Sequence, residues 1–224
     1  MLKADLHSHT VYSYDCCNSI DGIIKKCNKV GINCLAVTDH NEIKGAFELQ
    51  KHAPFRVIIG EEIDTGEGEV TGLFLNKLIS PGQGIHKTID LIKSQNGIVY
   101  IPHPLSISRN EMLNIPKILE RIGEIDIIEY FNSRTLKESR DKDWLDELFL
   151  NGKVIKGAGS DAHAIYELGN VIIELDHFED SDGFLKSLSS ARFHLKKTQG
   201  INRLIMNHRT RKILRKWMLP KKYL

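Results

Sequence analysis

Apolar residues follow two alternating periodicities along most of this chain. Short apolar runs of strand character, such as 33–40 (NCLAVTDH) and 96–104 (NGIVYIPHP), alternate with segments whose apolar residues recur every three or four positions. In the segment 19–30 the isoleucines and Cys27 share one helical face, and Gly31 follows as a helix end. The pattern predicts strands that alternate with helices.

The same periodicities assign elements to the whole chain. Strands are expected at 3–7, 33–40, 55–63, 68–75, 96–104, 125–132, 153–163, 170–175 and 192–198. Helices are expected at 19–30, 42–52, 85–95, 110–122, 138–150, 181–190 and 201–218. The strands 55–63 and 68–75 flank a Gly-containing turn, which predicts a hairpin. About seven β-α steps favour a distorted (β/α)7 TIM-like barrel of the α/β class, with a three-layer sandwich as the alternative.

Length and composition indicate one soluble domain. The chain has 224 residues, 41% of them hydrophobic, which suffices for a large core. No apolar run approaches the length of a membrane span, and the N-terminus enters a strand-like pattern without a charged and apolar leader. We therefore expect a cytoplasmic protein with no membrane partner. In that reducing compartment Cys16, Cys17, Cys27 and Cys34 are expected to be free thiols.

Charge divides the chain unevenly. Residues 184–224 contain twelve lysines or arginines and no acid, whereas residues 1–183 contain 19 basic and 29 acidic residues. We expect 1–183 to form a barrel domain with the chemical site, and 184–224 to be a basic segment packed on the barrel. Such segments either meet phosphate-rich partners, nucleic acid included, or neutralise the surface of their own domain.

Potential metal ligands follow five of the predicted strands. They are His7 and His9, Asp39 and His40, Glu61 and Glu62, His103, and Asp161 and His163. Because the chemistry of a β/α barrel lies at the carboxyl ends of its strands, these side chains should converge. Imidazole and carboxylate suit zinc, manganese or iron, and more than four ligands predict two or three divalent ions. Arg109 and Arg134 are candidates to neutralise a phosphorylated substrate.

Five segments together resemble one protein family. DLHSHTVYSYD, AVTDHNEIKGA, GEEI, IPHP and GSDAH stand in the order and spacing of the PHP (polymerase and histidinol phosphatase) family, and the resemblance covers about residues 3–175. It implies a distorted (β/α)7 barrel with two or three divalent ions in a cleft. It implies one ion on His7, His9, Asp161 and a bridging Glu62, a second on His103 and Glu62, and a third on Asp15, His40 and His163. Asp5 and Asp39 are expected to support the strand, His40 or the loop.

The chain departs from the family pattern in two places. Tyr14 stands where many members have the acid that follows H-x-H, so the expected ligand is Asp15, one residue later. Many members also supply a His or Cys after the strand 125–131, where this chain has Glu129, Asn132 and Arg134. This departure affects the ligand set of the second ion, so we expect either a binuclear site or a site completed by water or Asn132.

The resemblance implies hydrolysis of phosphate esters by a metal-bound hydroxide, as a phosphomonoesterase or a phosphodiesterase. We expect His103, Arg109 and Arg134 to be catalytic, and the substrate to be a small phosphorylated compound or a nucleotide. A TatD-like nuclease or amidohydrolase is one alternative, although such enzymes usually lack the D-x-H formed by Asp161 and His163. An RNA-binding protein without catalysis, similar to a ribonuclease P subunit, is the other, and the basic C-terminal segment would suit it. The nearly complete ligand set favours an enzyme.

Overall fold

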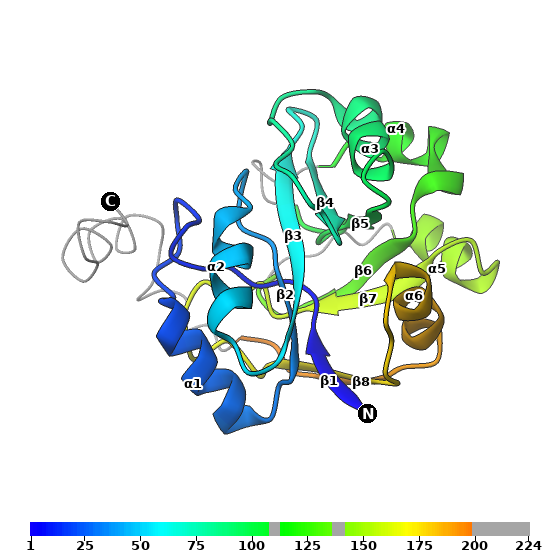
Figure 1. The fold of residues 1–224 in the computed structure, drawn as a ribbon. Coiled ribbons are helices and arrows are strands. Elements are labelled where there is room, and N and C mark those ends of the chain that lie inside the picture. The colour runs from blue at the N-terminus through cyan, green and yellow to red at the C-terminus, as the bar shows by residue number, and fades with distance from the viewer. Residues whose placement is uncertain (108–112, 136–141, 199–224) are drawn as a thin grey trace.

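The computed structural model describes residues 1–107, 113–135 and 142–198, which form one curved sheet with helices around it (Figure 1). The strands are β1 (Leu2–Asp5), β2 (Cys34–Val37), β3 (Arg56–Asp64), β4 (Glu69–Leu73), β5 (Ile98–Ile101), β6 (Ile127–Asn132), β7 (Ile155–Gly159), β8 (Val171–Leu175) and β9 (Arg192–Leu195). The helices are α1 (Ile20–Val30), α2 (Lys44–His52), α3 (Ile85–Lys93), α4 (Ile115–Glu120), α5 (Asp143–Leu150) and α6 (Ser181–Ser189), with a 3-10 turn at Ile122–Glu124.

The sheet curls into a nearly closed barrel. Its strand order is β7-β6-β5-β4-β3-β2-β1-β8-β9. β1, β2 and β3 pair in parallel, as do β5, β6 and β7, while β4 lies antiparallel between β3 and β5. A parallel bridge between Ser8 and Ala162 joins the carboxyl ends of β1 and β7. The predicted α/β class with a distorted TIM-like barrel is confirmed, and the distortion comes from β4 and from this narrow closure.

Helix boundaries follow from local sequence. Ser19 caps α1 by accepting a hydrogen bond from the backbone N–H of Gly22, and Gly31 ends the helix at a φ of 81°, where glycine has no steric cost. α4 begins at Ile115, so the prediction of a helix from residue 110 was wrong for residues 113 and 114. Pro116 explains this start, because proline is tolerated only in the first helical turn.

Other predictions were right in kind and imprecise at their ends. The hairpin of β3 and β4 is confirmed, as are α3, α6 and β9. α5 begins at Asp143, and residues 138–141 of its predicted range lie outside the described residues. The predicted helix 201–218 also lies outside them.

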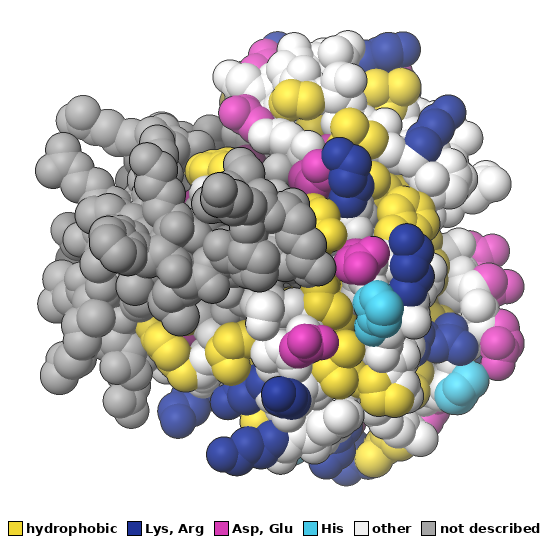
Figure 2. All heavy atoms as spheres, turned by 60° about the vertical axis from the view of Figure 1, so that its left-hand side comes forward, with side chains coloured by type: hydrophobic (Ala, Val, Ile, Leu, Met, Phe, Trp, Pro, Cys, Tyr) yellow, Lys and Arg dark blue, Asp and Glu magenta, His cyan; other side chains and the backbone are white. Residues whose placement is uncertain are grey.

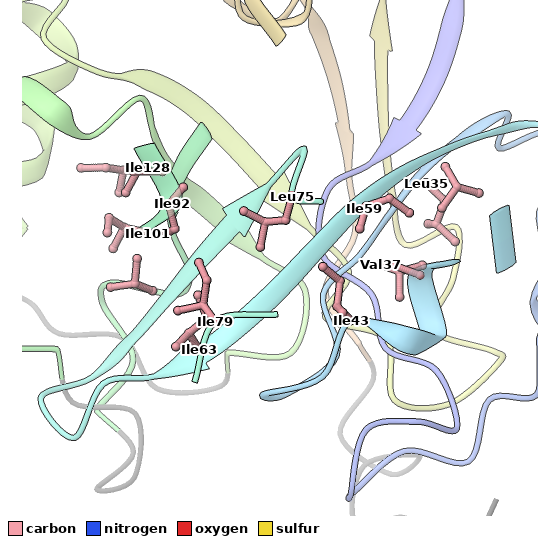
Figure 3. Packing of buried hydrophobic residues seen from close by; sticks show 14 of the residues in the cluster. Leu35, Val37, Ile43, Ile59, Ile63, Leu75, Ile79, Ile92, Ile101 and Ile128 are labelled. Carbon is pink, nitrogen blue, oxygen red and sulfur yellow. The ribbon is translucent and has the colours of Figure 1, made fainter. Parts of the chain in front are cut away.

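Two apolar clusters hold the barrel together. One lies between the sheet and the helices, and Figure 3 shows part of it, including Val37 of β2, Ile59 of β3 and Ile92 of α3. The other joins the opposite faces of the strands, through residues such as Ile58 and Tyr100, to Phe184 and Leu188 of α6. Side chains therefore fill the barrel, and polar residues collect at the carboxyl ends of its strands.

The charge boundary at residue 183 is not an element boundary. It falls within α6, and β9 then pairs antiparallel with β8, so the start of the basic segment belongs to the sheet. In the part of the chain that the structure describes, no helix is long and apolar enough to span a membrane.

Candidate metal centre

Polar side chains from five strands meet at one end of the barrel. His7 and His9 follow β1, His40 follows β2, Glu62 lies near the end of β3, and His103 follows β5. After β7, Asp161 and His163 complete the group. Backbone hydrogen bonds from Asp161 N to His7 O (2.8 Å) and from His9 N to Ala162 O (3.1 Å) join the segment after β7 to the segment after β1. The convergence expected from the strand ends is therefore present.

Glu62 is the centre of this group. Its Oε1 lies 2.9 Å from His103 Nε2. Its Oε2 lies 3.2 Å from His7 Nε2, 3.4 Å from His9 Nε2 and 3.3 Å from His40 Nδ1. One carboxylate thus faces imidazoles on both of its oxygens, which is the arrangement needed to bridge two cations.

A second group lies on the far side of His9. His163 Nε2 is 2.9 Å from Asp15 Oδ2, and His40 Nε2 is 3.8 Å from the same oxygen. The ring of His9 lies 4.0 Å from that of His163 and 4.7 Å from that of His40, centroid to centroid. Asp15, despite its later position in the sequence, therefore joins the residues expected with it.

Asp161 connects the first group to a buried arginine. Its Oδ1 lies 3.3 Å from His9 Nε2 and 3.8 Å from His7 Nε2. The Nη1 of Arg134 lies 3.3 Å from the same oxygen, and its Nε lies 3.4 Å from Glu167 Oε1. Arg134 is 8% exposed, so it holds a permanent positive charge inside the group rather than on the surface.

The pKa shifts in this group are set by burial and by opposite charges. Burial opposes ionisation of Glu62, but the imidazoles of His7 and His40 hold its pKa well below the usual value. Burial likewise opposes protonation of His40 and His103, but Glu62 and Glu69 raise the pKa of His40 to about 10 and that of His103 to about 9. The carboxylates here attract positive charge strongly, whether protons or metal ions supply it.

His9 is the histidine best suited to bind a metal as neutral imidazole. Burial and the nearby His163 lower its pKa to about 3. Both ring nitrogens are buried, and neither has a hydrogen-bond partner among the described residues, although Nε2 faces Glu62 and Asp161. A buried lone pair aimed between two carboxylates fits a divalent ion. Groups of residues able to hold an ion are His7, His9 and Glu62; His9, His40 and His163; and His40, Glu62 and Glu69.

Buried carboxylates behind the cluster fix the orientation of its members. Glu129 accepts hydrogen bonds from the Tyr100 hydroxyl (2.6 Å) and the His103 backbone (2.6 Å), and its Oε1 lies 3.1 Å from His7 Nδ1. With Nδ1 of His7 donating to Glu129, its Nε2 is directed at Glu62. Gly159 makes room for this contact, because a Cβ there would lie 2.2 Å from the Cβ of His7.

Asp39 and Asp5 hold loops rather than the imidazole of His40. Asp39 accepts two 2.6 Å hydrogen bonds from Thr10, one from its backbone and one from its hydroxyl. Asp5 accepts a 2.9 Å hydrogen bond from the backbone of Ser160. Of the two roles expected for Asp39, supporting a loop is therefore the one observed.

Two residues of this group have a strained backbone. His103 has a φ of 29° and Asp161 a φ of 51°, a region that residues other than glycine rarely adopt. Both residues face Glu62 or its neighbours. Such strain persists only where surrounding contacts enforce it, and it is common at functional sites.

Glu69 is the residue that sequence reasoning missed. It begins β4, and its Oε1 lies 3.3 Å from His40 Nδ1 while its Oε2 lies 3.4 Å from His103 Nε2. Burial and the nearby Glu62 raise its pKa. The predicted hairpin could have indicated Glu69, because the start of the second strand of a hairpin lies beside the end of the first, where Glu62 lies.

Two further predictions concern Arg109 and the cysteines. Arg109 lies outside the described residues. All four cysteines are free, as expected, and Cys16 donates to the backbone oxygens of His9 (3.3 Å) and His163 (3.4 Å). Cys16 therefore packs against the loops that carry these histidines.

Comparison with known proteins agrees with this geometry. The family model described as PHP domain matches residues 5–191. The uncharacterized protein MJ1587 of Methanocaldococcus jannaschii is 38% identical over 181 residues, covering 74% of this chain and 98% of the relative.

Solved structures show the same fold at low sequence identity. A two-domain protein of Bacteroides vulgatus that contains a predicted PHP-like metal-dependent phosphoesterase has a TM-score of 0.66 at 16% identity, covering 87% of this chain and 65% of that one. This chain thus spans less than two thirds of that protein. A candidate metal-dependent phosphoesterase of Bifidobacterium adolescentis has a TM-score of 0.58 at 14% identity, covering 89% of this chain and 98% of that one.

Proposed function

This chain belongs to the PHP domain family, and from that premise we propose that it hydrolyses phosphate esters with the aid of two or three divalent ions. The family match and the groups of histidine and glutamate able to hold metal ions indicate a metal-dependent hydrolase. The observation that carries the finer proposal is the position of Glu62, whose two oxygens face four histidines.

Three sets of residues would hold the ions. His7, His9, Glu62 and Asp161 would hold the first; His103, Glu62 and Glu69 the second; and Asp15, His40 and His163 the third. Their nitrogen and oxygen donors suit zinc, manganese or iron. Glu69 would replace the His or Cys that the family pattern places after the strand equivalent to β6.

Ions bound here would activate a water molecule and neutralise the oxygens of a phosphoryl group. The chain itself supplies the remaining positive charge through Arg134, held beside Asp161 and Glu167. Glu129 fixes His7 and the backbone of His103, so that their Nε2 atoms both face Glu62. Such fixed groups stabilise developing charge without rearranging during the reaction.

We further propose a small phosphorylated compound or a nucleotide as substrate, with hydrolysis of a monoester or a diester. Nucleic acid is a second partner that the basic residues after Leu195 would favour, since this part of the chain contains no acid. On the face in Figure 2, lysine and arginine side chains of the described residues are scattered among acidic ones. The described residues thus form no uniformly basic patch on this face.

Binding of RNA without catalysis is the alternative that this basic composition favours. Salt-sensitive binding of RNA, with no ester hydrolysis in manganese, would support it. The TatD-like or amidohydrolase alternative is disfavoured because Asp161 and His163 both contact the cluster.

The proposal is tested by purifying the protein with manganese or zinc, measuring bound metal by elemental analysis, and assaying nucleotide, sugar, histidinol and aryl phosphates. We expect more than one ion per chain and turnover of at least one ester. His103→Ala and Asp161→Ala should each abolish turnover while the circular dichroism spectrum is kept. His177→Ala is the control, because that side chain is 62% exposed and follows the end of β8 that pairs with Leu2, at the opposite end of β1 from His7. Less than one ion per chain, with no activity across the panel, would contradict the proposal.

A further inference from the structure

The end of the described chain is attached to a turn that enters the candidate metal centre. Thr198 N donates to Ser133 O (2.9 Å), and Ser133 Oγ donates to Lys196 O (2.9 Å). The hydroxyls of Ser133 and Thr198 lie 3.0 Å apart, and Asn170 Nδ2 donates to Thr198 Oγ1 (3.1 Å). The segment 196–198, beyond β9, therefore lies along the turn 132–135 that follows β6.

The side chain of Lys197 binds both ends of this turn. Its Nζ donates to the backbone oxygens of Asn132 and Thr135, each at 3.0 Å, and lies 4.8 Å from the centre of the Phe131 ring. A charged donor shared by the first and last residues of a turn holds its two ends together. The cation over the ring adds a further favourable contact.

The side chains of the same turn point into the candidate metal centre. Asn132 Nδ2 donates to Glu129 (2.9 Å) and to Asp161 (3.4 Å), while Asn132 Oδ1 accepts from the backbone of Arg134 (2.9 Å) and Thr135 (3.0 Å). Arg134 then reaches Asp161. The position of this turn therefore decides where Arg134 and Asn132 lie relative to the expected ligand Asp161.

We propose that Lys197 and Thr198 are positioning residues for the reaction. They act through the turn 132–135 by keeping Arg134 and Asn132 at the places where a phosphoryl group would be bound. This inference rests on the proposed function. It assigns to two residues of the basic segment 184–224 a role that is distinct from any attraction of nucleic acid by net charge.

The effect of loosening the turn follows from the residue that would move. A misplaced Arg134 would weaken contact with phosphoryl oxygens in substrate and transition state alike, which raises KM and leaves kcat almost unchanged. The residues of the three proposed ligand sets are on other loops, so the metal content should not change.

The matched variants are Lys197→Ala and Lys196→Ala in the full chain. They remove the same charge from adjacent exposed positions, but only Lys197 has its amine on the turn. With an aryl phosphate in manganese, we expect Lys197→Ala to raise KM roughly fivefold with kcat within about twofold, and Lys196→Ala to change neither. Lys197→Arg keeps a cationic donor and should restore most of the affinity. Equal KM values for the two alanine variants would overturn the proposal.

Hydrogen exchange of the amides of residues 133–135 provides a readout that needs no activity. We expect faster exchange in Lys197→Ala, and in Thr198→Val, than in Lys196→Ala. Unchanged exchange in Lys197→Ala would overturn the positioning role even if the wild-type protein is an active phosphatase. If the wild-type protein hydrolyses no ester while exchange responds as expected, the proposed function fails and the attachment of the turn stands.

Discussion

β3 carries two adjacent glutamates, Glu61 and Glu62, which point to opposite faces of the strand and whose pKa values are shifted in opposite directions. Glu62 points to the cluster of histidines, which hold its pKa well below the usual value. Its neighbour Glu61 points to the other face, where it accepts a 2.9 Å hydrogen bond from the backbone of Ile79, and burial raises its pKa to about 7. Both are buried, so the neighbouring charges, and not burial, decide which carboxylate is ionised.

The contrast extends to the buried aspartates. Burial raises the pKa of Asp5 and of Asp39 to about 6, and both hold loops through hydrogen bonds. Burial acts against ionisation of Asp161 too, but Arg134 and His7 hold its pKa well below the usual value. The pKa is thus lowered in Glu62 and Asp161, which face the expected metal ligands, and raised in Asp5 and Asp39, which hold loops.

The largest expected effect comes from exchanging each glutamate of β3 for glutamine. Glu62→Gln should lower kcat/KM by roughly 10³-fold and reduce the metal content, because the amide cannot bridge two cations. Glu61→Gln has the same change of shape and charge on the opposite face, and it should leave both quantities near the wild-type values. Elemental analysis and ester hydrolysis measure the difference. An equal loss in both variants would show that the contrast between the faces does not reflect function.

Removal of metal should have the next largest effect. A ligand that binds only the folded protein at 100 to 1,000 times its Kd contributes about 3–4 kcal/mol, so chelation should lower Tm by about 5–15 °C. Glu61→Gln should show the same shift and Glu62→Gln a much smaller one. Calorimetry with and without chelator provides the measurement. A full shift in Glu62→Gln would place the ions elsewhere.

The smallest expected effect concerns stability and pH. Because the pKa of Glu61 is raised from 4.5 to about 7, the folded protein keeps a proton that the unfolded chain has released between these pH values. The stability of the wild type relative to Glu61→Gln should therefore fall as pH rises from about 4.5 to about 7, by about 1–3 kcal/mol, and stay level above. Urea unfolding of both proteins at pH 5 and pH 8 isolates this group. A difference in stability that is the same at both pH values would contradict the raised pKa.

Much of the site could be predicted because ligands follow parallel strands. His7 and His9 come directly after the first strand, and the G-x-E spacing distinguished Glu62 from Glu61 before either face was known. Glu69 could not be found in the same way, because it begins a strand rather than ending one. Its position follows from the antiparallel insertion of β4, which depends on pairing between strands and not on local periodicity.

Prediction of the fold from sequence was limited in the same way. Periodicity located the strands and the helices, but the start of α4 depended on where Pro116 could be accommodated. The attachment of Lys197 to the turn after β6 joins segments far apart in the sequence, and no local pattern signals it. Contacts of this kind are decided by how the barrel closes.

The bridge between Ser8 and Ala162 has a consequence for the order of events during synthesis. A nascent chain that has reached residue 150 already contains His7, His40 and Glu62, yet it lacks Asp161 and the strand that closes the barrel. Joining chain ends so distant in sequence is slow, because the entropy of a long loop must be lost first. Capture of the proposed set of ions would therefore be a late step of folding, and it would mark a chain whose barrel has been completed.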